Sequence, residues 1–408
     1  MNFPRIQLAV AALLIATGIT AACGGGGSSR FNRPIVPPPP PTGTNYTTCG
    51  GQQVPNWQSS LFISNYQPAI QALVAHYSSN VGYFRIGLGR GGEINLPQGW
   101  NDQQANDACY GGYSGKWGYT VGAGSTWNSY LSTMVNFEST LGDSSKLLVS
   151  ITPINGENPN TETDDYIAGV ASQFGISFGN QGLESSDMAD FPDCGGDWCN
   201  LFGQYHPRIA ELQTLGQSCP ESTSCVNSLA TSTGPLPPLL AFATLHGAND
   251  LEIYYQDWLI AFDSDYASSI GASTQQAAYA AAIQLAAAAG ARMQILFPPE
   301  AGDSTMCGSQ TCFAAVQALL SNPAVSGVVI DVDWSDFDVA NSSGTGHGTY
   351  SFEITDAAIS PWTGTTVNLV LQNTTYGGSG SSCPSGIGQN GNAPSNCAMP
   401  AWMWTVLQ

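Results

Sequence analysis

Positively charged side chains are scarce in this sequence. Nine Lys and Arg stand against 29 Asp and Glu in 408 residues, and the formal net charge is −20. Such a charge repels phosphate groups and therefore argues against nucleic acid or an anionic membrane surface as a partner. Charged residues make up only 9% of the chain, so uncharged polar residues must form most of the surface. Such a surface suits a protein in acidic surroundings outside the cytoplasm.

Metal-ligand pairs and a nucleophilic serine motif are also missing. Cys194 and Cys199 resemble half of a zinc site, but zinc needs a second closely spaced Cys or His pair. The motif G-x-S-x-G, which positions the serine of α/β-hydrolases, is absent. We therefore expect no metal, no cofactor and no esterase chemistry. The four histidines are scattered through the chain, at His76, His206, His246 and His347.

Long apolar runs are confined to the N-terminus. Residues 1–22 hold one cation, Arg5, and an apolar run that ends at Ala22, which is typical of a secretory signal and short for a membrane span. With Cys23 directly after it, this segment resembles a bacterial lipoprotein signal, which implies a lipidated Cys23. Residues 23–48 form a Gly-rich and Pro-rich tether. We expect a lipid anchor in the bacterial cell envelope, facing the periplasm or the exterior, or else plain secretion.

The cysteine count supports export. Eleven cysteines minus Cys23 leave ten, an even number, and most of these form close pairs in the sequence. In exported proteins such pairs are usually disulfides that hold surface loops. The predicted bonds are Cys49–Cys109, Cys194–Cys199, Cys219–Cys225, Cys307–Cys312 and Cys383–Cys397.

Residues 49–408 have the length of one large domain, in which strand-like and helix-like runs alternate. Residues 60–64 are a short candidate for an eighth strand, whereas residues 198–215 and 237–248 both read as helices. Because polar and aromatic residues follow nearly every strand, we predict an α/β fold of the (β/α)8 TIM-barrel type, permuted or irregular in order. The rival fold is a doubly wound open sheet. The seven clear strands are residues 82–89, 146–154, 175–182, 251–258, 291–300, 325–334 and 366–372.

The first of these strands carries the spacing G-x-G-x-x-G at Gly87, Gly89 and Gly92. A dinucleotide site would need a helix to begin directly after these glycines. The chain continues instead as a loop with Pro97, and Glu93 would repel the phosphates. Glycines at a strand end also mark a bend or a close backbone approach. We therefore interpret this motif as a bend that delivers Glu93 to the C-terminal end of its strand.

The helix-like run 67–77, the strand and Glu93 together resemble the third helix and fourth strand of retaining glycosidases with (β/α)8 barrels. In that superfamily the fourth strand ends in the acid/base Glu, and the nucleophile lies three strands later. The resemblance implies that Glu93 is the acid/base and that the barrel is permuted, with residues 366–372 as an early strand. Counting three strands onward reaches Glu252 and Asp257, and Glu300 is a further candidate for the partner carboxylate. Asp257 lies nearer the strand end.

The run GVVIDVDWSDFD, residues 327–338, resembles the core of chitinase-type barrel glycosidases. Ser335 stands where those enzymes have their catalytic Glu, so we interpret the run as a buried strand ending in acids that hydrogen-bond to the loops of the barrel mouth.

Rings at this mouth would stack on sugars, and polar groups would bind their hydroxyls. The expected glycan contacts are Arg90, Trp100, Tyr254, Trp258, Asp333 and Trp334.

These patterns predict a glycoside hydrolase-like protein outside the cytoplasm, which acts on a glycan through a pair of carboxylates. Its partners would be carbohydrate and, through the lipid alone, a membrane. The alternative is a non-catalytic surface lipoprotein that binds glycans on the same fold, because a fold does not determine a function.

Overall fold

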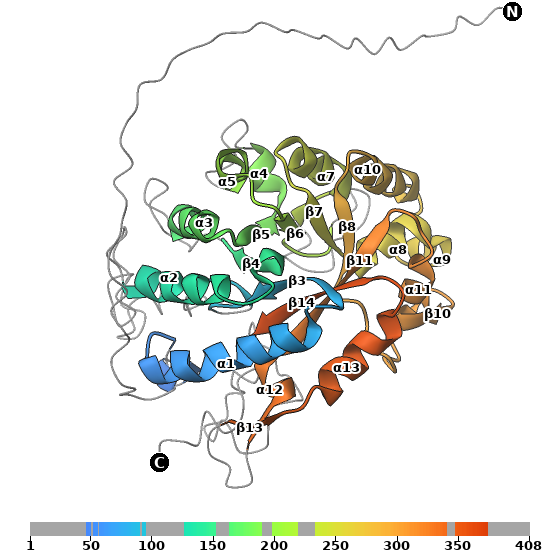
Figure 1. The fold of residues 1–408 in the computed structure, drawn as a ribbon. Coiled ribbons are helices and arrows are strands. Elements are labelled where there is room, and N and C mark those ends of the chain that lie inside the picture. Colours follow the sequence, from blue (N-terminus) through green and yellow to red (C-terminus); the bar gives the residue numbers. More distant parts are fainter. Residues whose placement is uncertain are drawn as a thin grey trace, which may run out of the picture. The chain divides into compact units, whose positions relative to one another are not determined.

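A computed structural model describes residues 46–49, 52–55, 57–89, 92–94, 126–151, 163–189, 198–218, 233–340 and 347–373. Eight parallel strands form a closed barrel in it, with helices around the outside (Figure 1). The predicted (β/α)8 barrel is therefore confirmed, and the open sheet is excluded. Around the barrel the strands are β3 (Val81–Ile86), β4 (Leu147–Ser150), β5 (Ser177–Leu183), β6 (Ala210–Thr214), β7 (Asp250–Tyr254), β8 (Arg292–Leu296), β11 (Val325–Asp333) and β14 (Thr366–Gln372).

Helices lie between the barrel strands along the chain, and short strand pairs decorate the connections. The helices are α1 (Ser60–Tyr77), α2 (Thr126–Ser139), α3 (Thr163–Phe174), α4 (Ser185–Ala189), α5 (Trp198–Tyr205), α7 (Leu236–Leu245), α8 (Tyr255–Phe262), α9 (Ser264–Ser269), α10 (Gln276–Ala288), α11 (Cys312–Leu319), α12 (Trp334–Phe337) and α13 (Glu353–Ile359). Three antiparallel pairs join β1 (Tyr46–Cys49) to β2 (Gln52–Pro55), β9 (Met306–Cys307) to β10 (Gln310–Thr311), and β12 (Asp338–Ala340) to β13 (His347–Tyr350).

The barrel strands follow one another in chain order, and α1 precedes the first of them. β14 pairs with β11 on one side and with β3 on the other, so that Leu369 lies opposite both Ile330 and Phe84. This strand closes the ring as the last one in the chain. Glu93 consequently follows the first barrel strand in chain order, and not the fourth as the glycosidase resemblance implied.

Three element predictions from the sequence are wrong. The predicted strand 251–258 ends early, because β7 stops at Tyr254 and α8 begins at the next residue. Residues 60–64 are the first turns of α1 and not a strand, because the hydroxyl of Ser59 caps this helix and accepts a hydrogen bond from Phe62 N at 3.0 Å. Residues 198–215 are not one helix. α5 ends at Tyr205, His206 adopts a positive φ of 46°, and the chain then enters β6, which is the eighth strand.

The main apolar core lies between the strands and the helices that surround them. Outward-facing strand residues such as Ile86, Leu251 and Val328 are fully buried against this layer. Inside the barrel, apolar contacts are limited to two small clusters, and polar side chains fill the space between them. The clusters are Tyr83, Leu148 and Ile209, and Leu296, Val329 and Val370.

One predicted disulfide is confirmed. Cys307 and Cys312 are bonded, with 4.6 Å between their Cα atoms, and they connect β9 to the start of α11. The other four predicted bonds involve residues outside the described ranges, or side chains such as that of Cys49 that the structure does not describe. The signal, Cys23 and the tether also lie outside these ranges. Among the described helices, none has the length and apolar character needed to cross a membrane.

Candidate functional site

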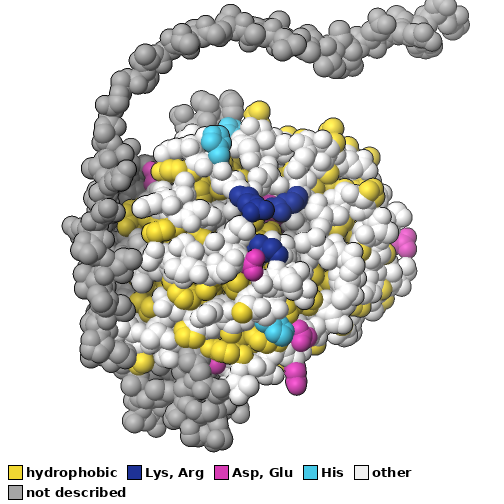
Figure 2. Space-filling model, in the orientation of Figure 1, with side chains coloured by type: hydrophobic (Ala, Val, Ile, Leu, Met, Phe, Trp, Pro, Cys, Tyr) yellow, Lys and Arg dark blue, Asp and Glu magenta, His cyan; other side chains and the backbone are white. Residues whose placement is uncertain are grey.

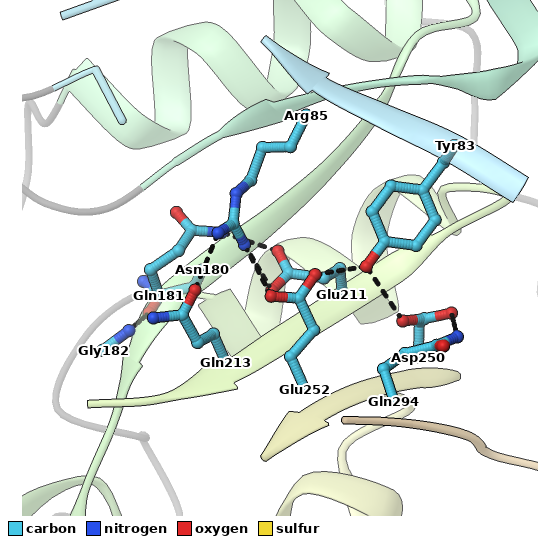
Figure 3. Close-up of polar contacts among 10 residues, drawn as sticks. All are labelled: Tyr83, Arg85, Asn180, Gln181, Gly182, Glu211, Gln213, Asp250, Glu252 and Gln294. Atoms are coloured by element: carbon cyan, nitrogen blue, oxygen red, sulfur yellow. Dashed lines mark hydrogen bonds and ion pairs between the residues drawn. The ribbon is translucent and has the colours of Figure 1, made fainter. Parts of the chain in front are cut away.

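A polar network fills the middle of the barrel and centres on one arginine (Figure 3). Arg85 of β3 donates from Nη1 to Glu211 Oε1 at 3.1 Å and to Glu252 Oε2 at 2.9 Å. Its Nη2 donates to Gln213 Oε1 at 2.7 Å. All four side chains are buried, so one cation holds two carboxyl groups from neighbouring strands in a fixed geometry.

The network continues toward the N-terminal ends of the strands. The hydroxyl of Tyr83 donates a short hydrogen bond to Glu252 and lies 3.4 Å from Asp250 Oδ1. Asp250 Oδ2 accepts from Gln294 Nε2 at 3.0 Å and pairs with Arg292 Nε at 2.9 Å. Arg292 is the partly exposed end of this chain of contacts, which therefore leads from the barrel interior to its surface.

Strand periodicity explains why these residues meet. Side chains two residues apart on a strand point to the same face, so Arg85 and Tyr83 both point inward, as do Glu252 and Asp250. Room for Glu211 comes from the neighbouring strand. A Cβ atom at Gly179 would lie 1.9 Å from Glu211 Oε2, and only glycine leaves that space open.

Two of the interior carboxyl groups, Glu211 and Asp250, hold their protons more tightly than usual. Burial, and then the charge of Glu252, raise the pKa of Glu211 well above its ordinary value, although Arg85 opposes this shift. Burial likewise raises the pKa of Asp250 to about 7, against the opposing charge of Arg292. For Arg85, burial lowers the pKa, but Glu252 and Glu211 outweigh it and raise the pKa above the usual value. The Arg85 guanidinium thus stays charged, while the raised pKa values of Glu211 and Asp250 favour their protonated forms.

At the C-terminal end of β7, Tyr254 connects this network to the barrel mouth. Its side chain is half-buried and hydrogen-bonds to Gln213, the amide that Arg85 holds. Burial, followed by the charge of Asp331, raises the pKa of Tyr254 to about 12, and the charge of Glu93 adds to the rise. Tyr254 is therefore close enough to be influenced by the charges of Glu93, which follows β3, and of Asp331, near the end of β11.

Two acids mark the C-terminal end of β11. Asp331 is exposed by its surface area, yet enough protein atoms lie around its carboxyl to desolvate it. This desolvation raises the pKa of Asp331 to about 6, while a hydrogen bond with Gln372 lowers it. Burial, followed by the charge of Asp336, raises the pKa of Asp333 to about 7. Both groups are therefore largely protonated in mildly acidic surroundings.

Glu93 is placed by the glycines that precede it. A Cβ at Gly87 would lie 2.6 Å from Leu371 O, and Gly92 has a positive φ of 76°. The backbone folds back so that Gly89 N donates to Glu93 O at 2.6 Å. The glycines therefore shape a tight turn after β3, as the sequence indicated, and the half-buried Glu93 follows that turn.

The three candidate partner carboxylates lie in three different environments. Glu252 is fully buried in the interior network. Asp257 lies in the first turn of α8, where its carboxylate accepts from both Oγ and N of Ser218, the former at 2.6 Å. It therefore anchors the segment that follows β6 and is closed to solvent. Glu300 is exposed beyond β8. Burial raises the pKa of Asp336, and the charge of Glu300 adds to the rise.

Two of the three predicted tryptophans, Trp258 and Trp334, are not at the mouth. Trp258 is fully buried and donates to the backbone oxygen of Gln294 at 3.2 Å. Trp334 is also fully buried, packs against Tyr66 with 4.8 Å between the ring centroids, and donates to Asp338 Oδ2 at 2.8 Å. Both rings belong to the core, and neither faces a ligand. Two further predicted contacts, Arg90 and Trp100, lie outside the described residues.

Asp333 has a local structural contact. It precedes α12 as the N-cap residue, and its backbone N donates to Asp336 Oδ2 at 3.0 Å. The sequence interpretation gave the acids of the run 327–338 contacts with the mouth loops, whereas this contact lies within the turn that begins α12. Within the described ranges, no three His, Cys, Asp or Glu residues are grouped so that they could hold a metal ion.

Arg85 and Glu211 belong to the site, although no sequence pattern singled them out as candidates. Asp331 also belongs to it, and the sequence placed it in the chitinase-like run 327–338 but interpreted it as a structural acid. A signal existed for Arg85, because it lies in an otherwise apolar strand of a chain with nine cations. Glu211 had none, because its segment was assigned to a helix.

Comparisons with protein-family models and with curated proteins find no match for this chain.

Proposed function

We propose that the barrel mouth binds a glycan and cleaves it as a glycoside hydrolase. In this proposal Asp331 protonates the glycosidic oxygen, and Glu93 is the second carboxylate of the pair. The proposal needs one carboxyl group that is both open to a ligand and protonated under working conditions.

Asp331 carries this proposal. Its side chain is open to solvent at the C-terminal end of β11, where barrel enzymes have their active sites. Because desolvation raises its pKa to about 6, Asp331 is mostly protonated at pH 5. An acid with this pKa both holds a proton at pH 5 and releases it readily when the leaving group needs it.

The neighbours of Asp331 suit a polyhydroxylated ligand. Gln372 hydrogen-bonds to Asp331, and Gln213 hydrogen-bonds to Tyr254. Amide and phenol groups both donate and accept hydrogen bonds, as sugar hydroxyls require. The ion pair of Arg85 with Glu252 fixes Gln213 from below, so the amide is oriented before a ligand binds.

The position of β11 is compatible with a catalytic carboxylate but does not support its role as the proton donor. It is the seventh barrel strand in chain order, and the glycosidase resemblance gives the strand three after the fourth the nucleophile. The fourth strand here is β6, which carries Glu211. That side chain is fully buried on Arg85, so in this proposal it supports the site and does not touch the glycan.

The test is a search for glycan hydrolysis followed by two matched substitutions. The purified protein is incubated at pH 5 with a panel of polysaccharides and oligosaccharides, and new reducing ends are measured. Asp331→Asn keeps the shape of the side chain but removes its proton, so turnover should fall by about 10²–10⁴-fold while glycan binding persists. Asp143→Asn makes the same chemical change before β4, at the other end of the barrel, and should leave turnover unchanged.

The result also separates the two function classes. Turnover that survives Asp331→Asn would remove Asp331 from the mechanism. Glycan binding without turnover in the unsubstituted protein, across the whole panel, would instead favour the non-catalytic glycan-binding alternative.

A further inference from the structure

Cations gather at the N-terminal ends of the barrel strands. Lys146 directly precedes β4, Arg208 lies two residues before β6, and Arg292 is the first residue of β8. Because the strands are parallel, all three lie at the same end of the barrel. Figure 2 shows the Lys and Arg side chains of the described part close together near the centre of one face. The fourth described cation, Arg85, is buried inside the barrel.

The backbones that carry Arg208 and Arg292 are fixed to each other through Asn249. The Asn249 amide Nδ2 donates to Arg208 O at 3.2 Å, and its Oδ1 accepts from Ala210 N at 2.9 Å. On the other side, Arg292 N donates to Asn249 O at 2.9 Å. β6 and β8 are separated only by β7, so their backbones lie about 10 Å apart. Two arginine side chains can converge on one small group across that distance.

Charge on this face is only partly neutralised. Arg292 pairs with Asp250 at 2.9 Å, but burial raises the pKa of Asp250 to about 7, so this carboxyl is an incomplete counter-ion at neutral pH. Lys146 donates to the backbone oxygens of Ser78 and Val81. Arg208 is exposed, and within the described part of the chain its guanidinium has no ion pair or hydrogen bond. Positive charge on this face is therefore left without a full counter-ion, which favours the binding of an added anion.

We propose that Arg208 and Arg292 form a binding site for one small oxyanion of the phosphate or sulfate type. The planar guanidinium presents paired N–H donors that match two oxygens of such a group, which a single ammonium does not. Lys146 adds a positive charge to the same face. Asp143, three residues before it in the chain, is the nearest acid to it in the sequence. The large negative charge of the whole chain disfavours an extended polyanion, so the site is suited to a single group. The group arrives either as a free ion or as part of a lipid headgroup.

The experiment measures phosphate and sulfate binding to the full-length protein by calorimetry, with chloride added to keep the ionic strength constant. We expect saturable binding of one ion per chain. Arg208→Gln should weaken the affinity by at least about ten-fold, because hydrogen bonds to charged groups are the strong ones. Arg208→Lys keeps the charge but loses the paired donors. Its affinity for the ion should lie between that of the unsubstituted protein and that of Arg208→Gln. Gln284→Glu lowers the net charge by the same one unit on α10 and should change little.

A second arm identifies the source of the anion. Vesicles of phosphatidylglycerol and of phosphatidylcholine are sedimented with the protein at low salt. Retention on phosphatidylglycerol alone, lost in Arg208→Gln, would assign the site to a lipid headgroup, whereas no retention with intact phosphate binding would assign it to a free ion. The absence of saturable binding to either ion and to vesicles, or equal affinity in Arg208→Gln, would overturn the proposal. Because Arg208 is exposed, the variant should fold, and circular dichroism checks that it does.

Discussion

Arg85 and Glu252 form an ion pair inside the barrel, with 2.9 Å between Nη1 and Oε2 and with both side chains closed to solvent. A pair in this setting is costly to form but more costly to break, because removing one partner leaves an unpaired buried charge. The pair also fixes Gln213, which contacts Tyr254 at the mouth. Stability and site geometry therefore depend on the same contact.

Arg85→Met should destabilise the fold by about 3–5 kcal/mol, because Glu252 and Glu211 lose their common cation. The free energy of unfolding is measured by urea denaturation at pH 7. Adding Glu252→Gln to Arg85→Met removes one of the carboxyl groups left without a cation, and should recover part of the lost free energy of unfolding. A double variant that is less stable than the single one would contradict this account of the network.

Stability should be greatest in acid and should fall as the pH rises. Burial raises the pKa of both Asp250 and Asp257 to about 7 in the folded protein, well above the ordinary Asp value near 4. Between about pH 4 and pH 7 the folded state therefore binds more protons than the unfolded state, and the free energy of unfolding decreases with pH. Their contribution is fully present below about pH 4 and is lost as the pH passes about 7. Urea unfolding at several pH values measures the slope.

Asp257→Asn gives that measurement its control. Asparagine still offers one oxygen to Ser218 but no longer titrates, so the slope between pH 4 and pH 7 should decrease by the share of one proton. An unchanged slope would mean that the pKa of Asp257 is not raised above its ordinary value in the folded protein.

Gly179→Ala tests how tightly the interior network is packed. The new Cβ would lie 1.9 Å from Glu211 Oε2 and 2.8 Å from Glu211 O, and the backbone atom has no free rotation to escape. We expect a loss of at least about 1–3 kcal/mol, the usual cost of overpacking. Gly203→Ala lies within α5 with no atom near its added Cβ, and should instead stabilise the protein by about 0.5–1 kcal/mol. Thermal unfolding of both variants makes the comparison.

The barrel was predictable because its outward-facing strand residues and the helices that cover them follow simple apolar patterns. β6 escaped prediction for a physical reason. Its interior positions hold Glu211 and Gln213 instead of apolar residues, so the segment shows the polar and apolar mixture of an exposed helix. The break before it depends on the positive φ of His206, which few sequence patterns report.

The site depended on side-chain direction, which a sequence does not give. Asp257 was expected at the end of a strand, but β7 ends at Tyr254 and a helix begins at the next residue. The helical turn points Asp257 toward Ser218. Asp331 remains on a strand and so faces the mouth. Asp257 is therefore a structural carboxylate because a helix begins before it, whereas Asp331 stays on its strand and remains a candidate for catalysis.

Glu252 should also set the acidity of Asp331 from a distance. Burial is the main cause of the raised pKa of Asp331; the charge of Arg85 lowers this pKa, and the charge of Glu252 makes a smaller contribution that raises it. Glu252→Gln removes a negative charge, so the pKa of Asp331 should fall below about 6, as measured by NMR titration of its side-chain carboxyl. Glu211→Gln takes a carboxyl from the same arginine and is the control; it should shift the titration less, since only Glu252 of the two acts on Asp331. If Asp331 is the proton donor, the upper limb of the pH–rate profile should move to lower pH with the same variant, whereas a purely structural role for Glu252 would lower the rate at every pH without moving that limb.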